Sequence, residues 1–273
     1  MPETSDPVSP FQIAPVVRRA IAGLLCLLGG GAASCVLFAA STVTPAKAAD
    51  NVLTPAEEQD GWRLLWDGKT TAGWRSARSG NFPDHGWIIH DGELAVAASE
   101  GKESAAGGDI ITLENFSNFD LQVDFKITPG ANSGIKIFVD TGLNKGSGSA
   151  IGLEYQILDD ALHPDAKLGR NGNRTMASLY DLIPPDPAKP VYPIGEWNHA
   201  RILSRGRHVE HWLNGRKVVE YERGSPEFRA LVATSKYAKW PHFGELPEGP
   251  ILLQDHGNAI SFKNVKIRIL PAP

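Results

Sequence analysis

Apolar and polar residues alternate with a period of two along several stretches of the chain. In residues 119–127 every second residue is apolar, and the residues between them are polar or charged. Because successive side chains of an extended strand point to opposite faces, this pattern predicts a strand with one buried face. Further strands are expected at residues 135–139, 151–158, 197–203, 251–256 and 260–270. Only residues 54–60 are expected to form a helix, a short one with Thr54 as its N-cap and Pro55 in its first turn.

Tight turns connect two pairs of these predicted strands. An Asp-Gly pair lies in the middle of residues 87–96, and an Asn-Gly pair in the middle of residues 208–221. Both pairs tolerate the positive φ angles that two-residue hairpin turns require. Residues 183–193 contain five prolines and are expected to form a surface loop. Many antiparallel strands without intervening helices predict an all-β chain folded as an antiparallel β-sandwich or jelly roll.

The N-terminal segment differs from the rest of the chain. Two arginines precede an almost wholly apolar stretch at residues 20–40, and a small-x-small sequence ends at Ala48. These features predict an export signal peptide over residues 1–48, followed by a single jelly-roll domain over residues 49–273. The protein would then be periplasmic or extracellular, without stable membrane insertion. The alternative is an anchor that stays in the membrane, because the apolar stretch is long enough to span a bilayer.

Composition and charge limit the classes of function. The 273 residues are 42% hydrophobic and 21% charged, with a formal net charge of −4. This composition is typical of a globular protein, and the charge gives no support for binding nucleic acid. Both cysteines, Cys26 and Cys35, lie in the predicted signal peptide. After its removal the chain has no disulfide, no thiolate metal site and no cysteine nucleophile.

Two predicted strands carry polar residues on one face. Alternation places Glu154 and Gln156 together, opposite the apolar residues of their strand, and it places Gln254 and His256 on one face of another strand. Carboxylate, amide and imidazole groups bind sugar hydroxyls, so these faces indicate a carbohydrate-binding groove. The alternative is a solvated outer face, which is normal for an antiparallel sheet.

Motifs spread along the chain resemble those of the bacterial 3-keto-disaccharide hydrolase domain family. They are Gly61-Trp62-Arg63-Leu64-Leu65-Trp66-Asp67-Gly68-Lys69, Gly73-Trp74, Phe119-Asp120-Leu121, Asn132-Ser133-Gly134-Ile135, Glu154-Tyr155-Gln156-Ile157-Leu158-Asp159, Ser178-Leu179-Tyr180-Asp181-Leu182, Gly195-Glu196-Trp197-Asn198, His211-Trp212-Leu213-Asn214-Gly215, Leu253-Gln254-Asp255-His256-Gly257 and Ile260-Ser261-Phe262-Lys263-Asn264-Val265-Lys266-Ile267. The resemblance implies a concanavalin A-like jelly roll related to glucanases and lectins. It also implies activity on glycosides oxidised at C3 of the sugar, usually in exported proteins.

The implied reaction is an elimination. A ketone at C3 acidifies the C2 proton, since the resulting anion spreads onto the carbonyl oxygen. A general base removes this proton, the C1 substituent leaves, and water adds, so that the net result is hydrolysis. Such a site needs a base, an acid for the leaving oxygen, and donors or a cation at the developing enolate.

Eight residues are candidates for this site. Glu154 and His256 are expected to be the base and the acid, in either order. The side chains expected to hold hydroxyls or the enolate, or to stack on the sugar ring, are Gln156, Gln254, Lys236, Lys136, Trp212 and Tyr155. For Trp212 and Tyr155, burial in the core is the alternative.

Other functions on the same scaffold are a non-catalytic, lectin-like carbohydrate-binding module and a hydrolase of unmodified glycans. Jelly-roll glucanases carry Glu-x-Asp-x-Glu on one strand, whereas residues 154–159 lack this alternation, so a standard retaining mechanism is not expected. A divalent cation such as calcium is suggested by the scaffold's relatives, but the sequence shows no ligand set for it.

Overall fold

The computed structural model describes residues 49–146 and 148–273. These residues belong to one compact unit, Ala46–Pro273. The predicted signal peptide lies outside the described residues, so both the peptide and the domain boundary at residue 48 stay predictions. Among the described residues, no helix is both long enough and apolar enough to cross a bilayer.

The larger of two antiparallel sheets, here sheet A, has eight strands in the order β11-β10-β9-β6-β13-β4-β3, with β1 also paired to β13. Its strands are β1 (Trp62–Leu64), β3 (Trp87–His90), β4 (Glu93–Val96), β6 (Phe119–Ile127), β9 (Asn198–Arg205), β10 (His208–Leu213), β11 (Arg216–Glu222) and β13 (Ile260–Ile269). The β3–β4 and β10–β11 hairpins turn at the predicted pairs: φ is 51° at Asp91 and 48° at Asn214, and the glycine after each also has positive φ. This geometry confirms the turn predictions.

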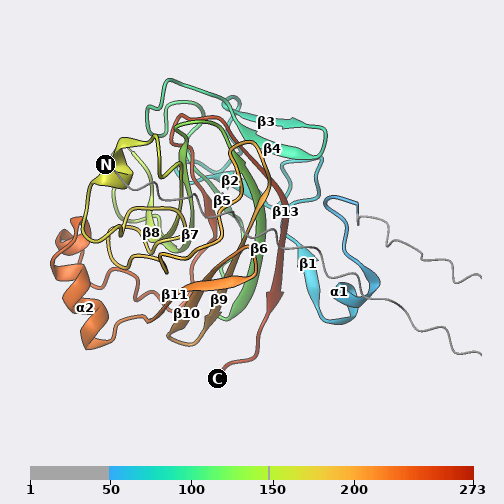
Figure 1. The fold of residues 1–273 in the computed structure, drawn as a ribbon. Coiled ribbons are helices and arrows are strands. Elements are labelled where there is room, and N and C mark those ends of the chain that lie inside the picture. The colour runs from blue at the N-terminus through green and yellow to red at the C-terminus, as the bar shows by residue number, and fades with distance from the viewer. Residues whose placement is uncertain (1–48, 147) are drawn as a thin grey trace, which may run out of the picture. The chain divides into compact units, whose positions relative to one another are not determined.

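The smaller sheet, here sheet B, has five strands in the order β2-β5-β12-β7-β8. They are β2 (Trp74–Ser76), β5 (Ile110–Thr112), β7 (Asn132–Asp140), β8 (Ile151–Leu158) and β12 (Leu252–Leu253). The two sheets form the two layers of a sandwich, and its apolar core includes residues of both, such as Phe125 and Phe262 of sheet A and Ile135 and Leu153 of sheet B (Figure 1). The predicted all-β, antiparallel jelly-roll sandwich is therefore confirmed.

The helices are short. They are α1 (Pro55–Gln59), α2 (Pro226–Ala233) and the 3-10 turns η1 (Pro164–Lys167) and η2 (Lys236–Lys239). Thr54 caps α1 as predicted, since its hydroxyl accepts a bond from the Glu57 N–H and the Glu57 carboxylate accepts one from the Thr54 N–H. The sequence analysis did not predict α2, which has only eight residues and packs Phe228, Leu231 and Val232 against the core.

The strand predicted at residues 251–256 is much shorter in the structure. Only Leu252–Leu253 pair on both sides, because the chain then leaves the ladder at Asp255. The Asp255 carboxylate accepts hydrogen bonds from the N–H groups of Ala106, Gly107 and Gly108, at 2.8–3.0 Å. These bonds fix the position of Asp255, next to His256, without regular strand pairing.

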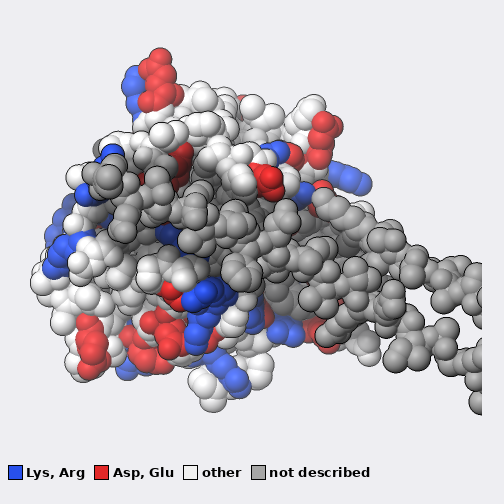
Figure 2. Space-filling model, viewed as in Figure 1, with Lys and Arg blue, Asp and Glu red and all other residues white. Residues whose placement is uncertain are grey.

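Charged side chains of both signs are interspersed on the described surface visible in Figure 2. The formal net charge of the whole sequence is −4.

Candidate active site

Strand β8 is buried on both of its faces, which is unusual for an antiparallel sheet. Leu153, Tyr155 and Ile157 point into the sandwich core. Glu154 and Gln156 point the other way, as predicted, and lie opposite Lys136 and Gly134 of β7. The backbone at residues 177–180 bonds to the free edge of β8, with hydrogen bonds between Ala177 N and Gln156 O at 2.7 Å and between Tyr180 N and Glu154 O at 3.0 Å.

Glu154 and Lys136 form a buried ion pair on this outer face of sheet B. The Glu154 Oε2 lies 3.5 Å from the Lys136 Nζ, and the two side chains are 4% and 5% exposed. Lys136 also donates to the Ala150 carbonyl at 3.1 Å and to the Ser149 hydroxyl. The Ser149 hydroxyl in turn donates to Asp109. A continuous polar chain thus runs from Glu154 through Lys136 and Ser149 to Asp109.

Asp109 is a second carboxyl group behind Lys136, which it reaches through Ser149. Its side chain is buried, and this burial raises the pKa of the Asp109 carboxyl, against the opposing effects of Lys136, Ser149 and the N–H groups of Ala150 and Asp255. Its oxygens accept bonds from Ala150 N at 3.0 Å and Asp255 N at 3.1 Å, in addition to Ser149. Asp109 therefore positions Lys136 through Ser149. Both of its carboxylate oxygens already accept hydrogen bonds from the protein.

Gly134 leaves the space that Glu154 occupies. A Cβ at position 134 would lie 2.7 Å from the Glu154 Oε1 and 3.0 Å from its Cγ. The φ angle of Gly134 is not positive, so the glycine is required here for space and not for backbone conformation. The motif Asn132-Ser133-Gly134-Ile135 therefore has a direct relation to the position of Glu154.

Several polar atoms of the neighbouring side chains have no partner among the described residues. Within the described residues, both side-chain polar atoms of Gln156, the Oε1 of Gln254 and the Nδ1 of His256 are buried without a hydrogen bond. The backbone N–H of Gln254 donates to the Gly134 carbonyl, which places Gln254 beside Gly134 along one edge of β7. Gln156 pairs with Gly134 across the other edge of β7. Buried polar groups are normally satisfied. A cluster of unsatisfied ones on one face indicates a place where a polar ligand binds.

His256 and Glu154 are not in contact among the described residues. His256 instead faces His163, the N-cap of η1, with the ring centroids 6.1 Å apart and the rings nearly perpendicular. Burial, together with the neighbouring His256, lowers the pKa of His163. His256 lies two residues beyond Gln254, so Glu154 and His256 are expected on either side of the two glutamines and not as a directly bonded couple.

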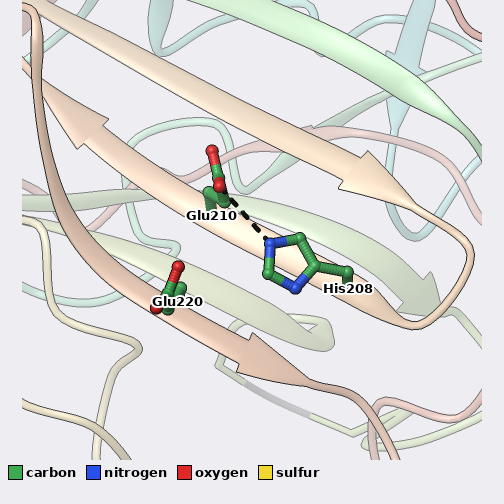
Figure 3. A group of neighbouring side chains, drawn as sticks. All are labelled: His208, Glu210 and Glu220. Carbon is green, nitrogen blue, oxygen red and sulfur yellow. Dashed lines mark hydrogen bonds and ion pairs between the residues drawn. The ribbon is translucent and has the colours of Figure 1, made fainter.

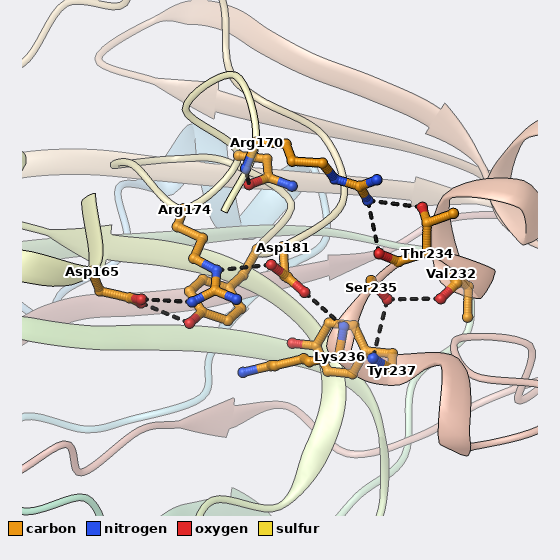
Figure 4. A network of polar contacts seen from close by, with 11 residues as sticks. Asp165, Arg170, Arg174, Asp181, Val232, Thr234, Ser235, Lys236 and Tyr237 are labelled. Carbon is orange, nitrogen blue, oxygen red and sulfur yellow. Dashed lines mark hydrogen bonds and ion pairs between the residues drawn. The ribbon is translucent and has the colours of Figure 1, made fainter. Parts of the chain in front are cut away.

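Lys236 reaches this face from the loop between β11 and β12. Its Nζ lies 4.0 Å from the centre of the Tyr180 ring and 5.2 Å from that of Tyr237. Its backbone N–H donates to the Asp181 Oδ2 at 2.8 Å, and the other oxygen of Asp181 accepts a bond from the Arg174 Nε at 2.8 Å. Figure 4 shows how these contacts join two loops that are distant in sequence.

Arg174 is the centre of this connection. Its Nη1 donates to the Asp165 Oδ1 at 2.9 Å, and the second oxygen of Asp165 accepts a bond from the Tyr180 hydroxyl at 2.6 Å. We refer to Asp165, Arg174, Asp181 and the Lys236 backbone as the clasp. A further bond from Arg170 to Thr234 joins the same two loops (Figure 4). The clasp fixes where Lys236 and Tyr180 stand relative to β8.

A cavity of about 450 Å³ opens beside Lys136 and Lys236. Its lining includes Lys136, Lys236, Tyr237 and Trp240, together with Glu103. Small-molecule sites usually occupy a few hundred cubic ångströms and combine aromatic walls with a few polar groups. Lys136 joins the cavity to Glu154, which lies directly behind it through their ion pair.

Two predicted stacking residues lie elsewhere. Tyr155 is fully buried in the core, where its ring packs 5.0 Å from that of His211 and its hydroxyl donates to the Trp212 carbonyl. Trp212 lies on the outer face of sheet A, under the Arg201 guanidinium and bonded to Glu210. The prediction that these rings stack on substrate is corrected: the aromatic groups near the cavity are Tyr180, Tyr237 and Trp240.

His208, Glu210 and Glu220 form the one group of three potential metal-ligand side chains within the described residues (Figure 3). All three lie on the outer face of the β10–β11 hairpin. Lys217 bonds to both carboxylates, and Glu210 also accepts a bond from Trp212 at 2.7 Å. A histidine and two lysine-paired carboxylates do not fit calcium, which takes six to eight oxygen ligands. The calcium prediction thus gains no support from this group.

Several site residues were not predicted from the sequence. Asp109 and Ser149 lie next to strand ends, and Tyr180, Tyr237 and Arg174 lie on irregular loops. Alternation cannot assign a face to a loop residue. The motif Ser178-Leu179-Tyr180-Asp181-Leu182 was the one available signal for Tyr180 and Asp181.

Residues 61–268 match the 3-keto-alpha-glucoside-1,2-lyase-like domain family. The chain is 36% identical over 241 residues to a protein of Bacteroides thetaiotaomicron named 3-keto-disaccharide hydrolase, and the match covers 81% of this chain and 82% of that protein. The fold is similar to the solved structure of a candidate glycosyl hydrolase of Parabacteroides distasonis, with a TM-score of 0.71, 32% identity, and coverage of 82% of this chain and all of the other. A second such protein of that organism gives a TM-score of 0.53 at 30% identity, over 72% of this chain and 99% of the other.

The chain therefore belongs to the 3-keto-alpha-glucoside-1,2-lyase-like domain family. It is an enzyme of the hydrolase type. Both statements confirm predictions made from the sequence. The assignment of catalytic and binding residues is a separate matter and rests on the geometry described above.

Proposed function

We propose that this protein is an exported enzyme that cleaves 3-keto-glycosides, such as 3-keto-disaccharides, by removing the C2 proton and expelling the C1 substituent, after which water adds. The observation that carries the proposal is the cluster of buried polar atoms on Gln156, Gln254 and His256 that lack a partner among the described residues. A sugar ring with its hydroxyls and carbonyl would supply those partners. Family membership and the named Bacteroides relative support the same substrate class.

Glu154 is the general base in this proposal. It is the carboxylate next to the unpartnered amide of Gln156 on β8, and its ion pair with Lys136 fixes its direction. A carboxylate at C2 accepts the proton that the C3 ketone acidifies. Typical general-base catalysis accelerates such a step by about 10²- to 10⁴-fold.

The lysines stabilise the negative charge that then develops on the C3 oxygen. Lys136 and Lys236 both line the cavity, one beside Glu154 and one above the Tyr180 ring. Positive charge directed at a developing oxyanion in a site that excludes water contributes more than it would in solution. Gln156 and Gln254 orient the hydroxyl groups of the ring, and His256 protonates the leaving oxygen on the far side of the two amides.

A conventional retaining or inverting mechanism finds less support, because it needs two carboxylates around the scissile bond. Asp159, which follows β8, accepts bonds from the N–H groups of Gly130 and Ala161. Asp109 is occupied by Ser149 and two N–H groups. The one carboxylate in the described lining of the cavity is Glu103, which comes from the loop before β5 and not from the strand that carries Glu154.

Export is part of the proposal. It is supported by the arginine pair, the apolar residues 20–40 and the small residues up to Ala48. A calcium requirement is not included, because no suitable oxygen ligand set supports it among the described residues.

The test is to incubate the protein with a 3-keto-disaccharide and, separately, with its unoxidised parent, and to follow release of the aglycone sugar. We expect cleavage of the keto sugar alone, with 3-keto-glucose or the corresponding glycal as product. Cleavage of the parent at a similar rate would indicate an ordinary glycan hydrolase. Binding of both sugars without turnover would indicate a lectin-like module. Either result would overturn the proposal.

A further inference from the structure

The Lys236 ammonium has no anionic partner among the described residues. Its near neighbours are ring faces, with Tyr180 at 4.0 Å and Tyr237 at 5.2 Å. Two other lysines nearby are less exposed than Lys236 and differ from it. Lys136 contacts Glu154, and Lys189 contacts Asp160 at 2.6 Å. An amine that makes no hydrogen bond is free to react, whereas a paired ammonium must first break its bonds.

Two features of the surroundings lower the pKa of the Lys236 amine. The protein packed around it lowers the pKa of the Lys236 amine, and the positive charge of Lys136 acts in the same direction, while Glu154 and Glu103 oppose the shift. Neutral amines are nucleophiles, and a lysine next to another cation in a partly apolar pocket is a known arrangement for amine catalysis. Lys236 is nevertheless accessible, because it lines the open cavity.

The clasp holds this amine in place. The Lys236 N–H is bonded to Asp181, which Arg174 connects to Asp165, and Asp165 also accepts the bond from Tyr180. Lys236 and the ring beneath its ammonium are therefore fixed by one set of contacts (Figure 4). A reactive group held in this way needs little reorganisation to meet a bound substrate.

We propose that Lys236 forms a Schiff base with the C3 ketone of the substrate. This inference rests on the proposed function, because it takes the 3-keto sugar as the substrate. A ketone is the one electrophile that distinguishes this substrate from an ordinary glycoside, and an unpaired amine beside a carboxylate base is the group that exploits it. Lys236 then activates C3 covalently, in place of an electrostatic role at the C3 oxygen, and Lys136 is the cation that stays paired with Glu154.

The steps balance without an external oxidant or reductant. The neutral Nζ adds to C3, and the carbonyl oxygen leaves as water that carries the two amine protons; one proton from the solvent then protonates the imine, and it returns to the solvent when the imine is hydrolysed. Glu154 removes the C2 proton, and the C2–H electron pair forms the C2=C3 bond of an enamine. The nitrogen lone pair then restores the C3=N bond, C1=C2 forms, and the C1–O bond breaks with the aglycone taking a proton. One water adds at C1 as C2 regains a proton, and a second water hydrolyses the imine, so the net reaction consumes one water.

The experiment is reductive trapping. The full-length protein is incubated with a 3-keto-disaccharide and sodium cyanoborohydride, digested, and analysed by mass spectrometry. We expect a sugar adduct on the peptide that contains Lys236, formed together with loss of activity. Lys236→Arg keeps the positive charge but cannot form the imine, so it should lose activity by at least 10²-fold while the circular dichroism spectrum and melting temperature stay unchanged. Lys167→Arg, on an exposed lysine of η1, is the matched control and should keep both adduct and activity.

Each alternative outcome is decisive. Cleavage of the keto sugar without an adduct at Lys236, or with Lys236→Arg within tenfold of the native rate, overturns the Schiff base and leaves the proposed function intact. An adduct that forms mainly at Lys136 or at exposed lysines overturns the assignment to Lys236. Absence of both cleavage and adduct overturns the proposed function as well.

Discussion

The β10–β11 hairpin of sheet A and the β7–β8 pair of sheet B both carry carboxylates and a lysine on faces that point away from the core. On the hairpin, Glu210 and Glu220 lie beside Lys217, and all three are at least partly exposed to water. On β7–β8, Glu154 and Lys136 are 4–5% exposed and lie beside amides without partners. The residue types are similar in the two regions. Only on β7–β8 are they buried, and only there do neighbouring polar atoms on the same outer face lack hydrogen-bond partners among the described residues.

The difference between these two regions lies in what covers them. The free edge of β8 is bonded to residues 177–180, and the clasp ties the chain just after them to the loop that carries Lys236, while Glu154 and Gln156 on the outer face are buried. No comparable contact encloses Glu210 within the described residues, and exposed ion pairs contribute little to stability. A carboxylate on a strand is therefore informative about function when its burial removes water and its neighbours still need a ligand.

The largest effect is expected for Glu154→Gln. The amide is nearly isosteric with the carboxylate but cannot accept the C2 proton, so kcat for a 3-keto-disaccharide should fall by about 10²- to 10⁴-fold. The matched change on the hairpin, Glu210→Gln, should leave kcat within twofold. Steady-state kinetics on both variants checks this, and equal losses would mean that the two regions do not differ as argued.

Gly134→Ala should act on the same step through geometry. The added Cβ would lie 2.7 Å from the Glu154 Oε1, so the side chain must rotate away from its present position. We expect kcat to fall by about tenfold or more, because displacement of a catalytic group by about 1 Å can cost 10²-fold. In Gly80→Ala, the control, the new methyl meets nothing within 4 Å. A fully active Gly134→Ala enzyme would show that Glu154 needs no fixed position.

A histidine buried between the two sheets, His211, should make the protein less stable in acid. Burial lowers the pKa of His211 from 6.5 to about 4, against the bonds it makes to the backbone at Ala177 and Ser178. The unfolded chain then binds a proton below pH 6.5 that the folded chain does not bind until about pH 4, so stability falls as the pH drops through this window. The loss is about 3 kcal/mol at 1.36 kcal/mol per pKa unit.

Chemical denaturation at pH 7 and pH 4 measures this loss, with His211→Gln as the variant that removes it. His208 on the hairpin is the contrasting case. Burial opposes protonation there, but the bonds to Glu222 and Glu210 raise the pKa of His208 overall. A His208→Gln variant should keep the acid loss. If instead the His211→Gln protein lost as much stability as the native one, another group would be responsible.

The smallest effect is expected for Gln156→Leu, and it should be a gain in stability. Both polar atoms of this side chain are buried without partners, and an unsatisfied buried group costs about 1–3 kcal/mol. We therefore expect a higher melting temperature together with a higher KM.

Asp120→Leu in sheet A should do the opposite, because Asp120 is 1% exposed and bonds to Arg201 at 2.7 and 2.9 Å. Its loss leaves Arg201 without its partner. Thermal melts of the two variants make the comparison. A Gln156→Leu protein that melts lower than the native one would mean that Gln156 is satisfied in solution.

The fold was largely predictable because strand periodicity is a local property. The strand at 119–127, both hairpin turns and the Thr54 cap needed only their own residues. Alternation also placed Glu154 and Gln156 on the face opposite the core. It could not predict that this face would be covered, since the cover comes from loops whose positions depend on long-range contacts such as Asp181 to Lys236.

The same reason explains what stayed open at the site. Tyr155 and Trp212 were expected either to stack on the substrate or to lie in the core; Tyr155 lies in the core and Trp212 on the outer face of sheet A. The pattern within β8 already placed Tyr155 with Leu153 and Ile157. Asp109 and Ser149 were not predicted because they act through Lys136. Asp109 is distant from Lys136 in the sequence, and Ser149 is separated from it by the connection between β7 and β8.

The most direct test of the central claim, that the outer face of sheet B removes a proton from C2, is to run the reaction in deuterium oxide. The enzyme is given a 3-keto-disaccharide, and the released 3-keto sugar is examined by NMR, with the same sugar incubated beside the Glu154→Gln variant as the control for uncatalysed exchange. Elimination followed by addition of water predicts one solvent deuteron at C2 of each product molecule. A product that keeps its original hydrogen at C2 would contradict the account.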